Sequence, residues 1–323
     1  MTWQQRKNTY YKLNTKLSYL SNADILKLIS EGTKLGDNTV IDLSVPIFCK
    51  KLIITKLEHD NLFSTANLYN LPTYYNYGVG SSGFNCFREL LMHIKTTNWV
   101  LDDQIENFPL LYHYRIVRTE NGEKQDIDYN VEYWNSEAVG TYIDARNKAK
   151  YCVILFIEYI PIEVFGWLDT NYEKNKLYIS SIIKIVSFLR KNNIIHFDAH
   201  LRNIVTDGKI MYLTDFGLVY DEKFEIGNKE FYNNNRYYDY AQVIYGLRRG
   251  LLSISTEKNT QVWDTMIANV DRMKLDERYV ALLKKYKPII TIFGHFINDI
   301  RRDKNTIFPN ELVKTEIKKL ISK

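Results

Sequence analysis

The sequence predicts an α+β fold in which a strand-rich first half is followed by a helix-rich second half. Short apolar runs at 39–43, 47–54 and 151–157 have the length and apolar character of strands. From Trp167 onward, apolar residues recur mainly with a helical period. The chain has 323 residues, of which 45% are hydrophobic, so it suits one two-lobed domain or two compact domains.

Helices are expected at the start of the chain. Residues 1–31 predict one or two of them, because the apolar positions 25, 26, 28 and 29 form a stripe after a helix start signal at Ser21–Asn22. The expected strands at 39–43 and 47–54 follow. Residues 58–86 then predict an irregular insertion, and the apolar positions 87, 90, 91 and 94 predict the next helix.

Two further strands are expected at 110–117 and 127–134, with Asn121–Gly122 as the hairpin turn between them. Residues 136–149 predict a helix, which leads into the strand at 151–157. Near Ile160–Pro161 the expected strands give way to a mainly helical pattern of apolar residues. We therefore expect a first domain of residues 1–160 and a second domain of residues 161–323.

Composition and charge argue against several classes of protein. The net charge of +5 is small for this length, and charges of both signs alternate, so nucleic acid is not an expected partner. No apolar run reaches the roughly 20 residues of a membrane helix, and the N-terminus lacks the apolar core of a signal peptide. We expect a cytoplasmic protein with no membrane partner, although a secreted effector exported by a non-classical route would show the same features.

The cysteines and histidines predict no metal site of their own. The three cysteines, Cys49, Cys86 and Cys152, lie far apart and form neither a disulfide framework nor a metal-binding pair. The six histidines are scattered, and His295, in an apolar helical pattern, is interpreted as a core residue.

The strongest chemical signal is a pair of polar clusters in the second half. His196 begins an H-x-D-x-x-x-x-N motif that contains Asp198 and ends at Asn203, and a D-F-G motif begins at Asp215. Phosphoryl transfer needs a base for the attacking hydroxyl and ligands for the metal ions on the phosphates. Asp198 suits the first role, and Asn203 and Asp215 suit the second. The alternative is that His196 and Asp198 cap a turn and that Asp215 is a solvated loop residue.

These motifs resemble those of the protein-kinase-like superfamily. The resemblance implies a two-lobed protein-kinase-like fold with an enlarged β-rich N-lobe and a helical C-lobe. It also implies ATP and Mg²⁺ as cofactors and transfer of the γ-phosphate to a hydroxyl. From Phe48–Lys51 to the E-Y-x-P segment at Glu158, the chain is similar to a group of atypical bacterial kinase-like proteins.

Lys50 resembles the strand lysine that binds the nucleotide phosphates in kinases, and Glu89 resembles its helix partner. Strand alternation points Lys51 to the opposite face. Lys50 facing water at a sheet edge and Glu89 as a solvated helix residue are the alternatives. On a helical wheel Glu89 lies away from the apolar stripe, so its role requires a helix that is contacted on both sides.

Two glycine-containing segments compete as the loop over the phosphates. Gly78–Gly83 matches G-x-G-x-x-G, but it follows Lys50 and would make Lys95, at the end of a helical pattern, the phosphate lysine. We interpret it as part of an insertion able to fold over the site. The phosphate loop is then expected at 31–37, with Gly32 and Gly36, between the first two strands.

By the same resemblance, Glu158, Tyr159 and Ile160 form the hinge that hydrogen-bonds adenine, with Ile157 as gatekeeper. A strand end of no special role is the alternative. Asp239 resembles the helix aspartate that braces the catalytic loop, although an ordinary aspartate in a first helical turn explains it almost as well.

The acceptor is the least defined part of the prediction. Ser/Thr of a protein is the first choice, which makes the protein a serine/threonine-protein kinase. Phe197 replaces the arginine that reads a phosphorylated activation loop. His200 and the short segment between Gly217 and Asp239 are similar to aminoglycoside and choline phosphotransferases, so a small-molecule hydroxyl acceptor is the second choice. A pseudokinase that binds nucleotide or a partner without turnover is the third.

Overall fold

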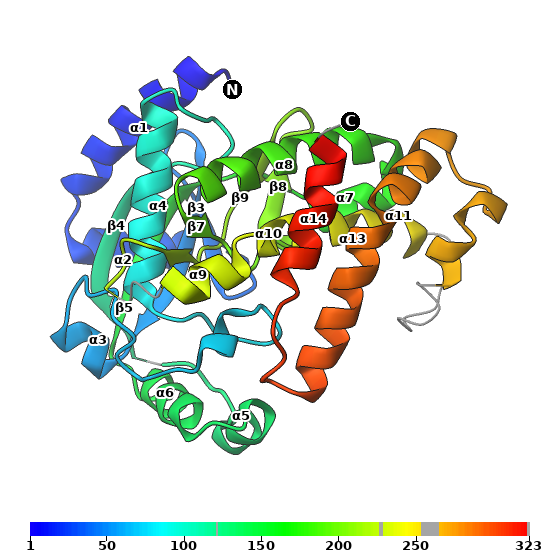
Figure 1. The fold of residues 1–323 in the computed structure, drawn as a ribbon. Coiled ribbons are helices and arrows are strands. Elements are labelled where there is room, and N and C mark those ends of the chain that lie inside the picture. Colours follow the sequence, from blue (N-terminus) through cyan, green and yellow to red (C-terminus); the bar gives the residue numbers. More distant parts are fainter. Residues whose placement is uncertain (121, 226–228, 253–264, 322–323) are drawn as a thin grey trace. The chain divides into compact units, whose positions relative to one another are not determined.

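The computed structural model describes residues 1–323 except 121, 226–228, 253–264 and 322–323. It is a mixed α+β protein with a sheet region and a helical region (Figure 1). The chain divides into two compact units, and the main division falls between Ile160 and Pro161, where the sequence predicts a boundary. Two short stretches depart from it. Residues 76–81 belong to the second unit, whereas Phe224 and Glu225 belong to the first.

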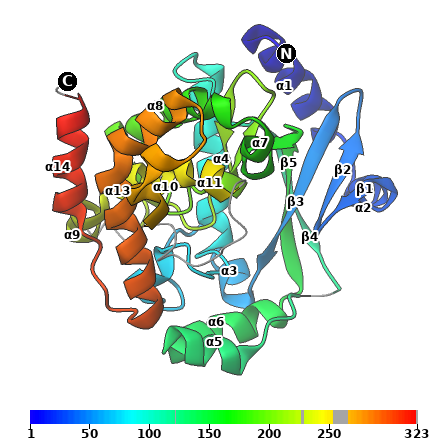
Figure 2. The ribbon, with the colours of Figure 1, turned by 90° about the vertical axis from the view of Figure 1, so that its right-hand side faces the viewer.

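An antiparallel sheet organises the first unit, with its strands in the order β1-β2-β3-β5-β4 (Figure 2). The strands are β1 (Thr33–Leu35), β2 (Asn38–Asp42), β3 (Pro46–Ile54), β4 (Leu111–Arg118) and β5 (Tyr151–Glu158). The central pair, β3 and β5, is in register from Ile47↔Glu158 to Ile54↔Tyr151. The predictions of strands at 39–43, 47–54, 110–117 and 151–157 are confirmed to within a few residues.

Helices surround this sheet. They are α1 (Trp3–Ser18), α2 (Asn22–Glu31), α3 (Lys56–Asp60), α4 (Cys86–Leu101), α5 (Ile127–Trp134) and α6 (Glu137–Asn147). Their starts follow local side-chain chemistry. Ser21 and Asp24 form a capping box at α2, and the Asn85 side chain accepts hydrogen bonds from two backbone N–H groups at the start of α4. One face of α4 packs on Leu52, Ile54, Val153 and Leu155 of the sheet.

The prediction of a strand at 127–134 is wrong, because these residues form α5. The Asp126 side chain caps the helix by accepting from the Tyr129 N–H, and Ile127, Val131 and Trp134 share one helical face. The proposed hairpin turn includes Asn121, which lies outside the described residues. With α1 to α6 in it, the first half is not strand-rich. A short helix, α3, also interrupts the insertion that was predicted to be irregular.

The second unit is helical around short strands. Its helices are α7 (Val164–Thr170), α8 (Asn175–Lys191), α9 (Lys229–Asn235), α10 (Tyr238–Tyr245), α11 (Arg249–Leu252), α13 (Glu277–Arg302) and α14 (Asn310–Ile321). Its strands are β6 (Ile162–Glu163), β7 (Ile194–Ile195), β8 (Ile204–Thr206), β9 (Met211–Leu213) and β10 (Tyr220–Asp221). β8 pairs with β6 and β9, and β7 pairs with β10. α13 and α14 pack side by side beside α10 (Figure 1).

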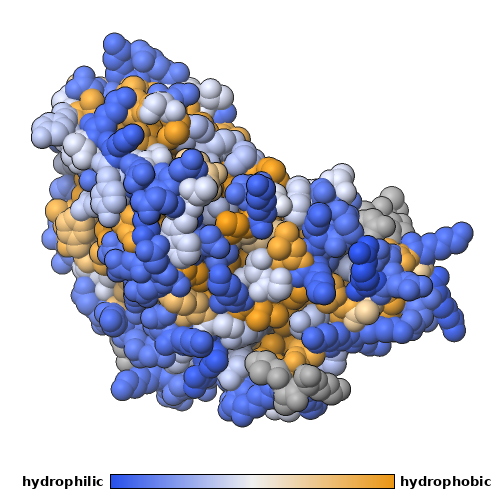
Figure 3. All heavy atoms as spheres, turned by 90° about the horizontal axis from the view of Figure 1, so that it is seen from above, coloured by the Kyte–Doolittle hydropathy of each residue, from blue (hydrophilic) through white to orange (hydrophobic). Residues whose placement is uncertain are grey.

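The surface adds two observations. The face drawn in Figure 3 is mainly hydrophilic, with hydrophobic side chains reaching it in scattered groups. His295 is exposed on α13, so its interpretation as a core residue is wrong.

In the part of the chain that the structure describes, we find no helix with the length and apolar character required to cross a membrane.

Candidate active site

The β8–β9 hairpin of the second unit brings two of the predicted site residues to one end. Asn203 directly precedes β8, and Asp215 follows β9 by one residue. Ile204 pairs with Leu213, and the Thr214 N–H donates to the Asn203 carbonyl at 3.0 Å. Antiparallel pairing therefore places Asn203 and Asp215 at the same end of the hairpin, although they are separated along the chain.

The Asp198 carboxylate is held by its own loop. The Asn203 side-chain amide donates to Asp198 Oδ2 and to the Asp198 carbonyl, both at 2.9 Å. His196 Nδ1 accepts from the Asp198 N–H at 3.2 Å, and His196 Nε2 lies 3.2 Å from the Thr214 carbonyl. Since Nδ1 accepts, Nε2 carries the proton and donates. The imidazole thus joins the Asp198 loop to the strand that leads to Asp215.

Asp239, at the start of α10, supports this loop from the backbone side. Its carboxylate accepts from the N–H groups of His196 at 2.7 Å and Phe197 at 2.9 Å. Phe197 has a φ of 62°, a left-handed conformation that costs a bulky residue free energy and persists only where its surroundings enforce it. Burial raises the pKa of Asp239 to about 7, and the two backbone hydrogen bonds act in the opposite direction.

The other carboxylate oxygen, Asp198 Oδ1, faces the His200 imidazole, with Nε2 at 3.5 Å. The His200 side chain is 40% exposed and the Asp198 side chain 20% exposed. The imidazole is thus both close to the carboxylate and partly exposed to solvent.

The two residues predicted to hold a metal ion both carry side-chain oxygen atoms. The Asn203 side chain donates its two hydrogen bonds through Nδ2, so its amide oxygen is the atom that could bind a cation, and Asp215 supplies a carboxylate at the same end of the hairpin. Mg²⁺ is commonly bound by one or two protein oxygen ligands together with substrate phosphates. The described ranges contain no group of three or more His, Cys, Asp or Glu able to hold a metal ion.

In the first unit, Lys50 on β3 contacts Glu89 on α4. The Lys50 Nζ lies 2.6 Å from Glu89 Oε1, with the two side chains 17% and 6% exposed. Lys50 is two residues from Leu52 on the face that packs against α4, whereas Lys51 is exposed and its Nζ donates to Thr119. α4 is buried on nearly all sides, which is how Glu89 reaches Lys50 although it lies away from the apolar stripe.

The segment predicted as the phosphate loop, residues 31–37, includes β1 and the turn between β1 and β2. Residues 33–35 form β1, and Gly32 is the C-terminal cap of α2. A Cβ on Gly32 would meet the side chains of Thr39 and Ile41, so this glycine permits close packing on β2. Gly36 lies in the tight β1–β2 turn with a φ of 59°. The segment thus contains a hairpin turn between two strands, and the binding of nucleotide phosphates by Gly32 and Gly36 stays a prediction.

The predicted hinge lies at the end of β5. Ile157 is buried, and Glu158 is held by Arg6 of α1 through Arg6 Nε to Oε1 at 2.8 Å and Nη2 to Oε2 at 2.7 Å. The Glu158 N–H donates to the Leu110 carbonyl at 2.8 Å, so that N–H is not available to adenine. Backbone groups of Tyr159 and Ile160, which follow the strand, remain candidates.

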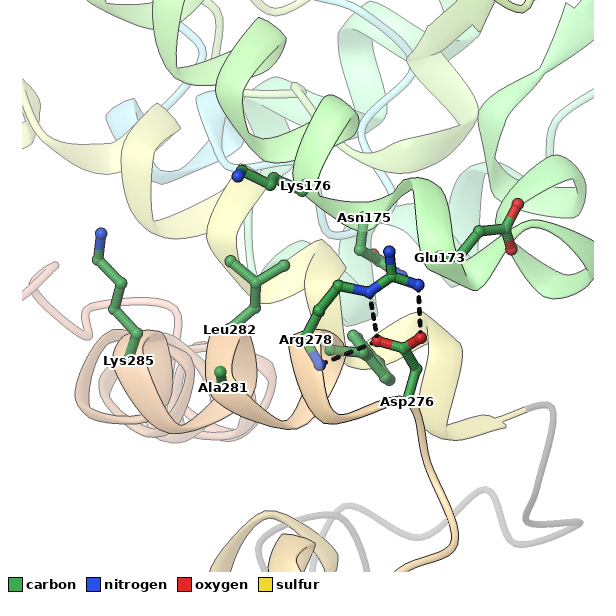
Figure 4. A pocket seen from close by; sticks show the side chains of 9 residues that line it. Glu173, Asn175, Lys176, Asp276, Arg278, Ala281, Leu282 and Lys285 are labelled. Atoms are coloured by element: carbon green, nitrogen blue, oxygen red, sulfur yellow. Dashed lines mark hydrogen bonds and ion pairs between the residues drawn. The ribbon is translucent and has the colours of Figure 1, made fainter.

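A hollow of about 350 Å³ lies elsewhere in the second unit, between the start of α8 and the start of α13 (Figure 4). At its rim Arg278 donates to the Asp276 carboxylate, and this contact holds the pKa of Asp276 at about 2. Its lining includes Lys176 and Lys285 but none of the predicted site residues. We assign it no role in the candidate site.

Sequence reasoning missed two residues of interest. Arg6 is a single basic residue in a polar helix, and nothing in the sequence indicates a partner 152 positions away. Gly78 was part of a recognised glycine pattern that was expected to be able to fold over the site, but its particular contact with Asp198 was not specified. A search of protein-family models finds no match to the chain, and a search of curated proteins finds none.

Proposed function

We propose that the protein is an ATP-dependent phosphotransferase with a two-lobed, protein-kinase-like fold and an enlarged N-lobe. It transfers the γ-phosphate to a hydroxyl, with Ser or Thr of a protein as the favoured acceptor. Asp198 is the base, Asn203 and Asp215 hold Mg²⁺, and Lys50, positioned by Glu89, binds the nucleotide phosphates.

The observation that carries the proposal is the fixed arrangement around Asp198. Its carboxylate accepts from Asn203, its backbone is tied through His196 to Thr214, and Asp239 holds the two preceding N–H groups. Several buried polar groups of this network thus bind to one loop. A base that must meet a hydroxyl in a defined geometry needs this degree of positioning.

In the proposed reaction the acceptor hydroxyl gives its proton to Asp198. The acceptor oxygen forms a bond to the γ-phosphorus, and the bond from that phosphorus to the β,γ-bridging oxygen breaks to release ADP. Mg²⁺, when bound, neutralises charge on the phosphates. The Lys50 ammonium places a second positive charge on the same nucleotide, and the 2.6 Å contact with Glu89 orients it.

A small-molecule acceptor is the second candidate, and His200 supports it. Its imidazole, 3.5 Å from Asp198 Oδ1 and partly exposed, offers a hydrogen bond to a compact polyhydroxyl or amino-alcohol acceptor.

Labelled ATP with Mg²⁺ separates the candidates. Label on the protein itself or on generic protein acceptors supports the first, and label only on aminoglycosides, choline or sugars supports the second. Nucleotide binding without transfer, unchanged in Asp198→Ala, makes the protein a pseudokinase and contradicts the proposal.

A further inference from the structure

A short segment of the insertion lies on the catalytic loop. Residues 76–81 belong to the second compact unit, although the chain on either side of them belongs to the first. We call residues 76–81 the strap. It contains Gly78, Gly80 and Ser81, and it is the same segment that matched a glycine-rich phosphate loop in the sequence.

Tyr77 anchors the strap. Its ring is 5% exposed and packs against Phe197, Tyr238 and Phe296, with ring centroids 5.7, 5.3 and 5.2 Å away. Its hydroxyl donates to Asn235 Oδ1 at 2.8 Å. Burial raises the pKa of Tyr77, so the phenol stays protonated as this bond requires. An aromatic ring held on several sides and by a hydrogen bond gives the strap a fixed position.

Beyond the anchor, the backbone turns tightly at Gly78. The Val79 N–H donates to the Tyr77 carbonyl at 2.7 Å, and Ser81 Oγ donates to the same carbonyl at 3.2 Å. This turn sets Gly78 directly against the catalytic loop. A Cβ on Gly78 would overlap Asp198 Oδ1 and would lie 3.1 Å from Asp198 Cγ and 3.4 Å from the Phe197 carbonyl.

Both oxygens of the Asp198 carboxylate therefore have a defined neighbour. Oδ2 accepts from Asn203, whereas Oδ1 lies between Gly78 and His200. The carboxylate has little freedom to rotate, because one side is tied by a hydrogen bond and the other is covered by backbone. A larger residue at position 78 would have to displace either the carboxylate or the strap.

We propose that Gly78 is a positioning residue for Asp198 and that the strap, anchored by Tyr77, forms one wall of the acceptor site. The inference rests on the proposed role of Asp198 as the base. It assigns the second glycine-rich segment to the acceptor hydroxyl rather than to the nucleotide.

Gly78→Ala tests this, with Gly166→Ala as its matched control, because a Cβ at Gly166 meets nothing within 4 Å. We expect Gly78→Ala to lower kcat about 100-fold, the effect of a small misplacement of a reacting group, with KM for ATP unchanged. Gly166→Ala should leave both values as in the wild type. Equal kcat in Gly78→Ala and the wild type would overturn the proposal.

A second measurement, by NMR, does not depend on phosphate transfer. The side-chain amide protons of Asn203 report on the Asp198 carboxylate, because Nδ2 donates to it at 2.9 Å. We expect their NMR signals to shift and to exchange faster with solvent in Gly78→Ala but not in Gly166→Ala. Unshifted signals contradict the positioning role even if kcat falls. If the wild type transfers no phosphate, the proposed function fails and these signals still decide the positioning claim.

If Gly78→Ala does not fold, Tyr77→Phe is a second variant that tests the same proposal. It removes only the hydroxyl that bonds to Asn235 and retains the ring. We expect the same Asn203 signals to shift in the same direction, by less, together with a smaller fall in kcat. Asn203 signals identical to the wild type in this variant would show that the strap does not position the carboxylate.

Discussion

At Asp198, one carboxylate oxygen accepts from an amide and the other lies between an imidazole and a glycine backbone. The lysine that is proposed to bind the nucleotide phosphates also has a defined contact. Lys50 and Lys51 are adjacent, but only Lys50 faces α4 and contacts a buried carboxylate. At the scale of the residue, the proposed function depends on which of two neighbouring side chains points to which face of a strand.

Lys50→Ala should lower kcat about 100-fold or more, because it removes a preorganised charge from the phosphates. Lys51→Ala is the matched control and should stay near the wild type, since its side chain faces the other side of β3. Lys95→Ala should likewise retain most activity, because Lys95 lies on α4 near the Trp99 ring. Steady-state kinetics with varied ATP measures all three. A large loss in Lys95→Ala with little loss in Lys50→Ala would reverse the assignment of the glycine segments.

Asp239 predicts a pH dependence of stability. Its pKa is raised to about 7 by burial, so the folded protein binds more protons than the unfolded chain between pH 3.8 and about pH 7. Its contribution to the free energy of unfolding therefore decreases as pH rises through this window. Asp239→Asn should flatten the dependence measured by urea denaturation.

Asp276→Asn is the control for that experiment, because the Asp276 pKa of about 2 places its titration below the window. The Asp276 variant should keep the wild-type slope between pH 4 and pH 7. A slope in Asp239→Asn identical to that of the wild type would show that Asp239 does not titrate there.

Residue contacts were predictable only where a motif or a strand face constrained them. Strand alternation and the resemblance together predicted that Lys50 would face Glu89. The contact of Arg6 with Glu158 had no such signal, because neither residue belongs to a pattern that includes the other. His295 was misplaced because its apolar neighbours suggested a core position, whereas the helix turns this residue outward.

At the scale of the element, two arrangements of strands and helices are most important for the proposed site and for stability. In the second unit the β8–β9 hairpin sets Asn203 and Asp215 at one end. In the first unit the buried pair of Arg6 and Glu158, with side chains 3% and 2% exposed, joins α1 to the end of β5. A buried ion pair of this kind strongly couples the two elements that it joins, because removing one partner leaves an uncompensated charge.

Arg6→Ala should therefore lower the free energy of unfolding by about 3–5 kcal/mol. Lys7→Ala, one position along the same helix, removes a contact with Asp103, whose side chain is 67% exposed, and should cost no more than about 1 kcal/mol. Urea denaturation of both variants measures the difference. Equal destabilisation by the two changes would mean that the Arg6 contact is not buried in solution.

Most elements were predictable from periodicity and start signals, and the failures have physical causes. Residues 127–134 are rich in β-branched and aromatic side chains, which favours a strand, but the Asp126 cap and the spacing of Ile127, Val131 and Trp134 favour a helix, and the cap and packing prevail. The strand β1 was not predicted, because it is only three residues long and exposed, so it leaves no apolar pattern. The sequence indicated that the segment containing Gly78 could fold over the site, but its contact with Asp198 was not predictable, because it depends on tertiary structure.

At the scale of the whole molecule, the chain forms two compact units, and each contributes one part of the proposed machinery: Lys50 with Glu89 in the first, and Asp198, Asn203 and Asp215 in the second. The proposal assigns both parts a role in phosphoryl transfer from ATP. Ligand binding to the folded state alone stabilises it, by about 2.7 kcal/mol at a ligand concentration 100 times Kd.

ATP with Mg²⁺ should accordingly raise the unfolding temperature, and Asp215→Asn should reduce the part of the shift that requires Mg²⁺. Asp207→Asn is the matched control, because Asp207 lies at the other end of the β8–β9 hairpin, where it accepts from the Lys209 and Ile210 N–H groups. Thermal unfolding with ATP alone, Mg²⁺ alone and both together measures this. A shift lost equally in both variants would place the nucleotide elsewhere.

The central claim is that Asp198 and Asp215 serve one reaction, and transfer of label from γ-labelled ATP in the presence of Mg²⁺ tests it most directly. The account predicts transfer by the wild type and by Asp207→Asn, and loss of transfer in both Asp198→Ala and Asp215→Asn. Transfer that persists in either of those two variants, or a wild type that binds ATP and labels no acceptor, would contradict it.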